Sequence, residues 1–211
     1  MSFEQAAFVE PVNTCMKGIE RLALKPGETV LVIGQGPIGI ILSVLAQRAG
    51  ARVITSDLHE QRLTISKGFG LEKAVNSTSA DVVGEARSRS EGRGVDAAIL
   101  AVGSNSLIRT AMDAVRPGGR VLLFAQTQHG EAVFDPAAVC VDEKTLIGSY
   151  SASVDLQAES VRFVMGQEMA LEKLISHRFP LSKAVEALAL AAQPQPDSMK
   201  IVIQPGVERQ K

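Results

Sequence analysis

Residues 30–57 read VLVIGQGPIGIILSVLAQRAGARVITSD, and this stretch decides how the chain folds. An apolar run leads directly into the glycine-rich turn GQGPIG at residues 34–39, and a helical pattern follows from Pro37 onward. A G-x-G-x-x-G string alone occurs often by chance. Its position between a strand and a helix makes it typical of a dinucleotide-binding unit.

The helix after this turn is well specified by its sequence. Pro37 suits a first helical position, and Gly50 suits the position just beyond a helix end. Ser43, Gln47 and Arg48 are expected to face outward. The opposite, apolar stripe consists of Ile38, Ile41, Leu42, Leu45 and Ala49.

From residue 28 to residue 150, short apolar or β-branched runs alternate with helical patterns. The runs are ETVLVI, ARVITSD, KAVN, GVDAAILAVG, GGRVLLFA and KTLIGSYS. Such alternation predicts β-α-β units, and therefore an α/β fold with a doubly wound parallel sheet of the Rossmann type. ETVLVI and DAAILAV are apolar almost throughout, as expected of central strands covered on both faces.

The domain organisation follows from this pattern. Residues 1–27 are expected to form a helical lead-in, with a helix at 11–24, and residues 28–154 the dinucleotide-binding domain. Residues 155–211 are expected to form a C-terminal α+β extension, with helices in DLQAESVRFVMGQ and SKAVEALALAAQ and strands in LISHRFPL and MKIVIQP. These two strands need cover from each other, from a second copy or from a separate polypeptide.

Composition limits the classes of function. The 211 residues are 45% apolar, and 22 Lys and Arg balance 23 Asp and Glu, which argues against nucleic acid or an anionic membrane as partner. No apolar run approaches the roughly 20 residues that span a bilayer, and the first residues lack a secretory pattern. The two cysteines, Cys15 and Cys140, lack C-x-x-C spacing and are expected to be small buried or half-buried groups. A cytoplasmic protein is expected.

Each glycine of the turn has its own expected role. Gly34 permits the tight turn, Gly36 lets a pyrophosphate approach the backbone, and Gly39 lets the helix pack closely on the sheet. Asp57 lies 21 residues after Gly36, at the end of the second strand, where a carboxylate accepts hydrogen bonds from ribose hydroxyls. That charge repels the 2′-phosphate of NADP, and no Arg stands directly beside it in sequence. NAD is therefore the predicted cofactor.

Two alternatives fit the same turn. In an α/β domain without a cofactor, the glycines serve packing alone and Asp57 caps a strand end. S-adenosylmethionine-dependent methyltransferases also combine a glycine-rich first turn with an acidic residue after the second strand. The apolar continuation PIGIILSVLAQ favours the dinucleotide.

Several stretches together resemble the medium-chain zinc-type dehydrogenases, most closely the sorbitol, threonine and related polyol dehydrogenase branch. They run from residue 6 to residue 63 and then include VDAAILAVGS, AVRPGGRVLLFA, LIGSYS and HRFPLSKAVEAL. The resemblance covers nearly the whole chain. It implies the NAD-binding portion of an oxidoreductase that acts on the CH–OH group of an alcohol or polyol by hydride transfer to NAD.

The resemblance also implies further contacts with the cofactor. Arg62 would lie along the adenine, although a solvated helix residue is an equally open interpretation. Thr14 would pack near the nicotinamide ring, and Phe124, Ser149 and Ser151 would offer backbone groups to its carboxamide. The other positions implied as cofactor-binding are Pro37, Ile38, Leu58, Ala101, Val102 and Gly103.

In the resembled family, a preceding barrel-like domain supplies the first zinc ligands and most of the substrate pocket. A catalytic zinc needs three protein ligands, and this sequence is expected to lack such a set and to be inactive alone. Glu10, 24 residues before Gly34, matches a Glu that reaches the zinc or its water in polyol-type enzymes. Its alternative role is a helix N-terminal acid favoured by the dipole. The histidines lack metal-ligand spacing: His59, His129 and His177.

The last run of the series, KTLIGSYS, is expected at a sheet edge, where an uncovered strand is a template for pairing. In the resembled family two subunits join through this strand, so a homodimer through residues 145–150 is expected. A non-enzymatic NAD-binding or interaction module is the second functional hypothesis, and a methyltransferase is the third.

Overall fold

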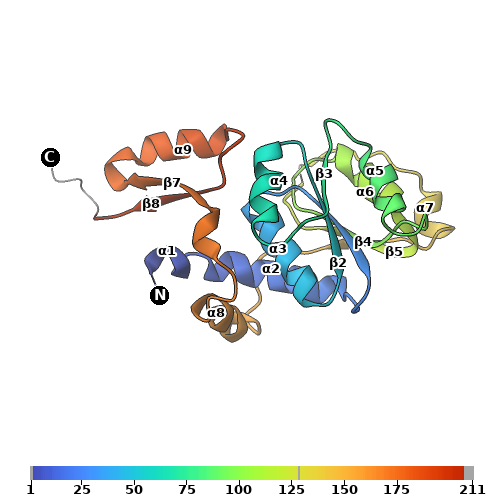
Figure 1. The fold of residues 1–211 in the computed structure, drawn as a ribbon, viewed down its shortest axis with the longest axis horizontal. Coiled ribbons are helices and arrows are strands. Elements are labelled where there is room, and N and C mark those ends of the chain that lie inside the picture. Colours follow the sequence, from blue (N-terminus) through green and yellow to red (C-terminus); the bar gives the residue numbers. More distant parts are fainter. Residues whose placement is uncertain (1, 128, 207–211) are drawn as a thin grey trace.

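The computed structural model describes residues 2–127 and 129–206, and its central feature is a six-stranded parallel sheet (Figure 1). The strand order is β3-β2-β1-β4-β5-β6. This order confirms the predicted doubly wound sheet, with a strand in each of the six runs. The strands are β1 (Thr29–Ile33), β2 (Arg52–Asp57), β3 (Ala74–Asn76), β4 (Val95–Leu100), β5 (Val115–Leu123) and β6 (Thr145–Gly148).

Helices cover both faces of the sheet, and an apolar cluster lies under each layer. α2 (Val9–Leu22) and α3 (Pro37–Arg48) close the first cluster, and α5 (Val82–Ser88) and α6 (Ser106–Ala114) close the second. Both layers shield the sheet from water, which a parallel sheet requires. The remaining helices are α1 (Phe3–Ala6), α4 (Glu60–Lys67), α7 (Ala137–Cys140), α8 (Gln157–Met165), α9 (Ala184–Ala192) and the 3₁₀ turns η1 (Leu171–Leu174) and η2 (Leu181–Lys183).

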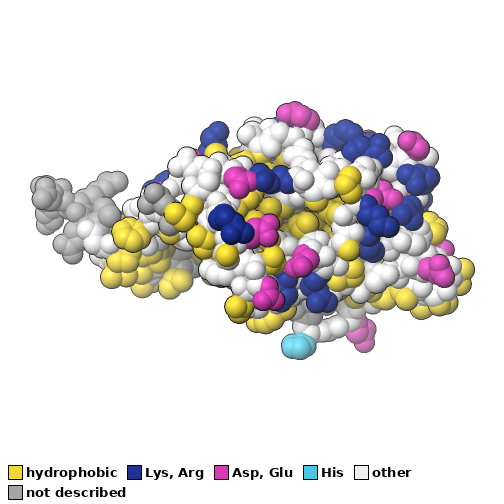
Figure 2. All heavy atoms as spheres, turned by 90° about the horizontal axis from the view of Figure 1, so that it is seen from below, with side chains coloured by type: hydrophobic (Ala, Val, Ile, Leu, Met, Phe, Trp, Pro, Cys, Tyr) yellow, Lys and Arg dark blue, Asp and Glu magenta, His cyan; other side chains and the backbone are white. Residues whose placement is uncertain are grey.

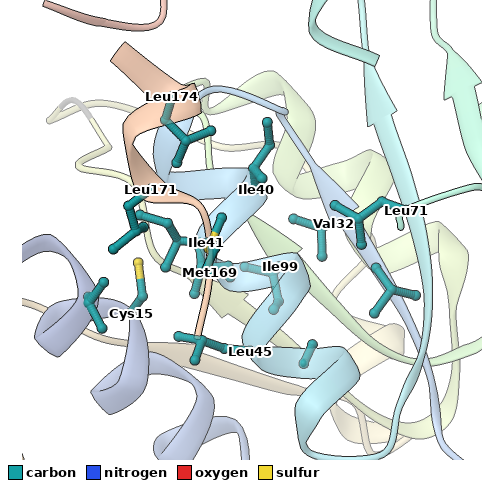
Figure 3. Close-up of a cluster of buried hydrophobic side chains, with 14 of the residues drawn as sticks. Cys15, Val32, Ile40, Ile41, Leu45, Leu71, Ile99, Met169, Leu171 and Leu174 are labelled. Carbon is teal, nitrogen blue, oxygen red and sulfur yellow. The ribbon is translucent and has the colours of Figure 1, made fainter. Parts of the chain in front are cut away.

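β1 lies inside the sheet, and all its residues are buried. Val30 and Val32 belong to the first cluster and Leu31 and Ile33 to the second, because successive strand side chains point to opposite faces. Burial on both faces explains why this run is apolar throughout. Figure 3 shows the first cluster, where side chains from α2, α3, β1, β4 and residues 169–174 meet.

The C-terminal extension forms a second, two-stranded sheet. β7 (Ile175–Pro180) and β8 (Lys200–Gln204) pair in parallel, with Phe179 opposite Ile203, and α9 connects them. The strands that needed cover therefore cover each other along one edge. In Figure 1 the extension projects from the end of the molecule that carries α1.

Glu4 of α1 links the two ends of the chain. Its carboxylate accepts hydrogen bonds from Arg178 Nε at 2.7 Å and Arg178 Nη2 at 3.0 Å, and from Gln204 Nε2 at 2.6 Å. The hydrogen bonds from Arg178 hold the pKa of Glu4 below its ordinary value. The helical lead-in is thereby attached to the extension.

The helix boundaries differ slightly from the sequence expectations. α2 begins at Val9 instead of residue 11 and ends at Leu22, where Ala23 adopts a left-handed conformation with φ of 50°. Gln47 and Arg48 of α3 are exposed as expected, but Ser43 is fully buried, so its outward placement was wrong. The reason is that Ser43 faces the glycine turn: its Oγ donates to the Gly39 carbonyl oxygen at 2.8 Å, and the buried Gln35 side chain lies against it, with Nε2 3.4 Å from Oγ.

Asp96, at the start of β4, is held by hydrogen bonds at the amino ends of the strands. Its Oδ2 accepts from the Thr29 backbone N–H at 2.8 Å, and its Oδ1 accepts from Arg116 Nε at 2.7 Å. Burial acts to raise the pKa of this carboxyl. The bonds from Thr29 and Arg116, with the charges of Arg116 and Arg93, outweigh burial and lower the pKa.

Asp96→Asn is therefore expected to lower the free energy of unfolding by about 2 kcal/mol at pH 7, because the new amide N–H₂ faces a donor. Because the folded-state pKa of Asp96 is depressed, its carboxylate stabilises the fold above the unfolded-state pKa of ~3.9, and this stability is lost as the pH falls through the folded-state pKa. Urea unfolding at pH 7 and pH 3 measures both effects. An Asn variant as stable as the unaltered chain at pH 7 would contradict the expectation.

Candidate functional site

The glycine-rich turn joins β1 to α3. Gly34 has φ of +96°, a left-handed conformation that residues with a β-carbon rarely adopt. A β-carbon there would also lie 3.2 Å from Val102 Cβ and 3.3 Å from the Ala101 carbonyl carbon. Both the conformation and the close approach of β4 therefore require glycine at this position.

Gly39 and Gly36 differ sharply in what surrounds them. A β-carbon on Gly39 would lie 1.8 Å from the Gly34 carbonyl oxygen, so the close packing of helix and turn requires glycine. A β-carbon on Gly36 would meet nothing within 4 Å, and its φ of −69° suits any residue. The fold alone does not require glycine at residue 36. The open space above it is where the sequence predicts a pyrophosphate.

Beside this turn lies a cavity of about 220 Å³ at the carboxyl ends of β1, β2 and β4. The strand order reverses between β1 and β4, and ligands of open α/β sheets bind at such a switch point. The predicted residues that line the cavity are Gly34, Gly36, Asp57, Leu58, Arg62, Ala101 and Val102. The residues that line it without having been predicted are Ile33, Ser56, Ser77, Val82, Leu107 and Thr110.

Asp57 ends β2 and is 7% exposed. Its Oδ2 accepts from the Gln35 backbone N–H at 2.7 Å, and its Oδ1 accepts from the His59 backbone N–H at 2.8 Å. Arg62 Nη1 lies 3.9 Å from Oδ2. The expectation that no Arg stands beside Asp57 holds along the sequence but is wrong in space, because the first turn of α4 brings Arg62 back toward the strand end.

Two buried polar atoms of the cavity have no hydrogen-bond partner within residues 2–127 and 129–206. They are Ser56 Oγ and Arg62 Nε. The Arg62 side chain is only 20% exposed, and its Nη2 lies 3.4 Å from the Ser198 carbonyl oxygen, which disfavours a solvated role. Buried polar groups without partners are unfavourable, so these atoms fit a polar ligand in the cavity.

The residues predicted for the nicotinamide end lie outside this cavity. Thr14 is on α2, where its hydroxyl donates to the Pro11 carbonyl oxygen at 2.9 Å. Phe124 follows β5, and Ser149 and Ser151 follow β6. The remaining predicted positions, Pro37 and Ile38 in the first turn of α3 and Gly103 after β4, flank the glycine turn and the loop beyond β4.

Comparison with known proteins identifies the family to which this chain belongs. The family model described as zinc-binding dehydrogenase matches residues 37–165, which run from α3 to the end of α8. The chain belongs to the zinc-binding dehydrogenase family. The resemblance expected from the sequence is therefore confirmed.

Individual relatives of this zinc-binding dehydrogenase chain are longer proteins. Sorbitol dehydrogenase of Bacillus subtilis (strain 168) is 24% identical over 206 residues, which are 97% of this chain and 58% of that protein. L-arabinitol 4-dehydrogenase of Aureobasidium melanogenum is 30% identical over 210 residues, covering 97% and 56%. The crystal structure of 2R,3R-butanediol dehydrogenase from Bacillus subtilis has a TM-score of 0.84 at 26% identity, covering 98% and 59%. The chain thus spans less than two thirds of each relative.

The family is named for zinc, but the described residues do not fit a zinc site. Within residues 2–127 and 129–206, no group of three or more His, Cys, Asp or Glu side chains could hold a metal ion. Glu10 is exposed in the first turn of α2, where an acidic side chain interacts favourably with the helix dipole. His59 precedes α4 as its N-cap residue, His177 lies in β7 beside Ser176 Oγ, and His129 is an exposed loop residue.

The two cysteines differ in environment. Cys15 is fully buried, and burial raises the pKa of its thiol, so the thiolate is strongly disfavoured at neutral pH. Cys140 is exposed, so the expectation of a buried or half-buried side chain was wrong for it. It ends the four-residue helix α7, which buries none of its residues. In the part of the chain that the structure describes, no helix is long and apolar enough to cross a bilayer.

Gln35 is a site residue that the motif did not indicate. It is fully buried, and its Nε2 donates to the Gly34 carbonyl oxygen at 3.1 Å and to the Val32 carbonyl oxygen at 3.3 Å, and lies 3.4 Å from Ser43 Oγ. Ser43 Oγ in turn donates to the Gly39 carbonyl oxygen at 2.8 Å. This side-chain network braces the turn from below. The sequence did contain a signal for this role, because Gln35 is a large polar side chain between two glycines in an otherwise apolar stretch.

Proposed function

We propose that this chain is the NAD-binding portion of a zinc-type dehydrogenase that oxidises the CH–OH group of an alcohol or polyol by hydride transfer to NAD. The observation that carries the proposal is the cavity at the switch point, where the open position of Gly36 adjoins the buried carboxylate of Asp57. Membership of the zinc-binding dehydrogenase family supports the class of reaction.

The chain's own residues divide the work of holding the cofactor. Backbone N–H groups at the start of α3 meet the pyrophosphate above Gly36. Asp57 accepts from the adenosine ribose, and Arg62 lies along the adenine. Leu58 and Val102, which are 56% and 39% exposed, line the same cavity and offer it apolar contacts. When bound, the nicotinamide ring supplies the hydride acceptor.

The nicotinamide half is assigned to the second group of residues. Thr14 packs near the ring, and backbone groups of Phe124, Ser149 and Ser151 bind the carboxamide. Ser149 Oγ is buried and has no hydrogen-bond partner in the described part of the chain, which supports a ligand contact on this segment. Ala101, Val102 and Gly103, which follow β4, are proposed to lie beside the adenosine, and Pro37 and Ile38 are proposed to contact the cofactor at the start of α3.

The division into residues 1–27, 28–154 and 155–211 belongs to the same proposal. Apolar side chains of the extension are exposed at residues Leu181 (60%), Val185 (82%) and Leu188 (64%). Figure 2 shows hydrophobic side chains gathered at the end of the molecule that the extension forms. Such a surface supports packing against another part of the catalytic enzyme, so we propose that this chain alone does not turn over substrate.

Among the described residues, the side-chain donors do not fit zinc. We propose that this chain alone holds no tightly bound zinc and that Glu10 is only the position matching the family's zinc-facing Glu. Metal analysis of tag-free protein tests the proposed lack of zinc. A result of about one zinc per chain would contradict it. We also propose a cytoplasmic protein with neither nucleic acid nor a membrane as partner, supported by the balanced charge.

A binding experiment tests the proposal against its alternatives. Titration of NADH fluorescence is expected to show saturable binding, and calorimetry with S-adenosylmethionine is expected to show none. Binding of S-adenosylmethionine without NADH would indicate a methyltransferase. Binding of NADH with no dehydrogenase activity in any longer form of the protein that includes this chain would favour the non-enzymatic NAD-binding module.

We further propose a homodimer that joins β6 edges through residues 145–150. β6 is the last strand in the sheet order, paired with β5 with Leu146 opposite Val121, and Tyr150 beyond it is 79% exposed. An uncovered edge strand pairs with its own copy across a two-fold axis.

Gly148→Pro is expected to convert such a dimer to a monomer. The Ser149 N–H donates to the Leu123 carbonyl oxygen of β5, so the N–H of the preceding Gly148 faces the open edge, and proline removes that donor; a β-carbon on Gly148 meets no atom within 4 Å. Sedimentation velocity at micromolar concentration measures the change, and circular dichroism checks that the variant remains folded. An unaltered chain that sediments as a monomer, or a folded variant that remains dimeric, would contradict the proposed interface.

A further inference from the structure

Asn13 of α2 makes an unusual pair of contacts with a distant loop. It is fully buried, its Nδ2 donates to the Ser153 carbonyl oxygen at 2.9 Å, and its Oδ1 accepts from the Ser153 backbone N–H at 2.8 Å. Nδ2 also lies 3.2 Å from Gln157 Oε1 and 3.5 Å from Ser160 Oγ. Two bonds to the backbone of one residue fix its orientation as well as its position.

A second contact from the same helix holds the other end of that loop. Lys17, one turn after Asn13, donates from Nζ to the Tyr150 carbonyl oxygen at 2.9 Å. Gly18 follows, and a β-carbon there would lie 2.8 Å from the ring of Phe124, so the helix backbone abuts this side chain. Residues 150–153 and Phe124 are thus all positioned by α2.

The loop at residues 149–153, which these contacts hold, carries two signs of a ligand site. Ser149 Oγ is buried and has no hydrogen-bond partner within the described residues. Ser151 has φ of +62°, which is disfavoured for a residue with a β-carbon and persists where its surroundings hold it. Asn13 and Lys17 hold the backbone on the C-terminal and N-terminal sides of Ser151.

We infer that α2 positions the nicotinamide end of the cofactor site, and that Asn13 and Lys17 are positioning residues that act through the loop at residues 149–153. The inference rests on the proposed binding of NAD. Asn13 contacts loop backbone, and it acts on the cofactor by fixing where Ser149 and Ser151 present their polar groups. Thr14, the next residue along α2, is the member of the helix proposed to face the ring.

The test compares two ligands that share the adenosine and pyrophosphate but differ at the nicotinamide. NADH binding is measured by fluorescence, and ADP-ribose binding by its competition with NADH. Asn13→Leu keeps the approximate size of the side chain and removes all its hydrogen bonds. We expect it to raise the Kd of NADH about tenfold and that of ADP-ribose less than about twofold.

Lys17→Met is the second variant, because the half-buried Lys17 leaves the core intact if Asn13→Leu fails to fold. We expect it to raise the Kd of NADH about threefold with no change for ADP-ribose. Asp96→Asn is the control, since it lowers stability at the opposite end of the strands. It is expected to leave the ratio of the two dissociation constants unchanged.

The outcomes separate this inference from the proposed function. If the unaltered chain binds neither NADH nor ADP-ribose, both are overturned. If it binds NADH but Lys17→Met and any folded Asn13→Leu weaken both ligands equally, or neither, only the positioning role of α2 is overturned. A selective loss of NADH affinity in either variant, with an unchanged ratio for Asp96→Asn, supports the inference.

Discussion

Gly39→Ala is expected to prevent stable folding, whereas Gly36→Ala is expected to leave the fold intact and abolish cofactor binding. The β-carbon added at Gly39 would lie 1.8 Å from the Gly34 carbonyl oxygen, and the helix cannot withdraw without separating from the sheet. The loss of stability is expected to exceed ~3 kcal/mol, because the overlap is with rigid backbone and not with a flexible side chain.

The alanine at residue 36 meets no atom of the protein within 4 Å, and the backbone there has φ of −69°. Its methyl group instead occupies the space above the turn that we propose for the pyrophosphate. We expect a melting temperature like that of the unaltered chain and a Kd of NADH raised by about a hundredfold or more.

Thermal unfolding by circular dichroism and NADH titration measure the pair, and each variant is the control for the other. A Gly36→Ala chain that binds NADH normally would show that no pyrophosphate lies against this turn. A Gly39→Ala chain with unchanged stability would show that α3 and the turn leave room for a β-carbon at residue 39.

Asp57→Ser is expected to reverse the preference between the two nicotinamide cofactors. The unaltered chain should bind NADH more tightly than NADPH, because the buried carboxylate accepts from the ribose and repels a 2′-phosphate. Loss of these charge-assisted bonds should raise the Kd of NADH about 10- to 100-fold. The affinity for NADPH should increase, since Arg62 Nη1 lies 3.9 Å from Asp57 Oδ2 and becomes free to pair with phosphate.

Arg62→Met in the Asp57→Ser background is the matched control. It removes the guanidinium and keeps the apolar stem. Because Arg62 is proposed to lie along the adenine of both cofactors, its loss should weaken both, but NADPH by the larger factor, so the gained preference for NADPH should disappear. Fluorescence titration of both cofactors with all variants measures the ratio. Equal affinity of the unaltered chain for NADH and NADPH would contradict the role of Asp57.

The path of the chain through the main sheet could be predicted because its signals are local. Apolar runs of strand length, helical periodicity and punctuation by glycine and proline lie within a few residues of each other, as at residues 30–57. The same local order indicated the turn, with Gly34 and Gly39 required by conformation and close packing. It also indicated Asp57, because the end of the second strand falls at a fixed place in such a unit.

Other features depend on contacts between one element and the next. Ser43 is buried because the side chain of Gln35 in the glycine turn lies against it, and Arg62 faces Asp57 because α4 turns back over the strand end. Cys140 is exposed because its helix lies on the surface and buries nothing. Periodicity predicts which face of a single helix or strand is apolar. It does not predict which other elements pack against that helix or strand, so it does not predict these burials and contacts.

The sequence by itself thus determined the sheet, the glycine turn and the acid that follows it, since short-range stereochemistry allows few other conformations there. Only the folded structure decided how the two ends of the site are supported. Gln35 braces the turn because its side chain is buried between the end of β1 and Ser43 of α3, and Asn13 reaches Ser153 across 140 residues of sequence. Both are buried amides, and a buried amide is stabilising only where folding brings its hydrogen-bond partners to it.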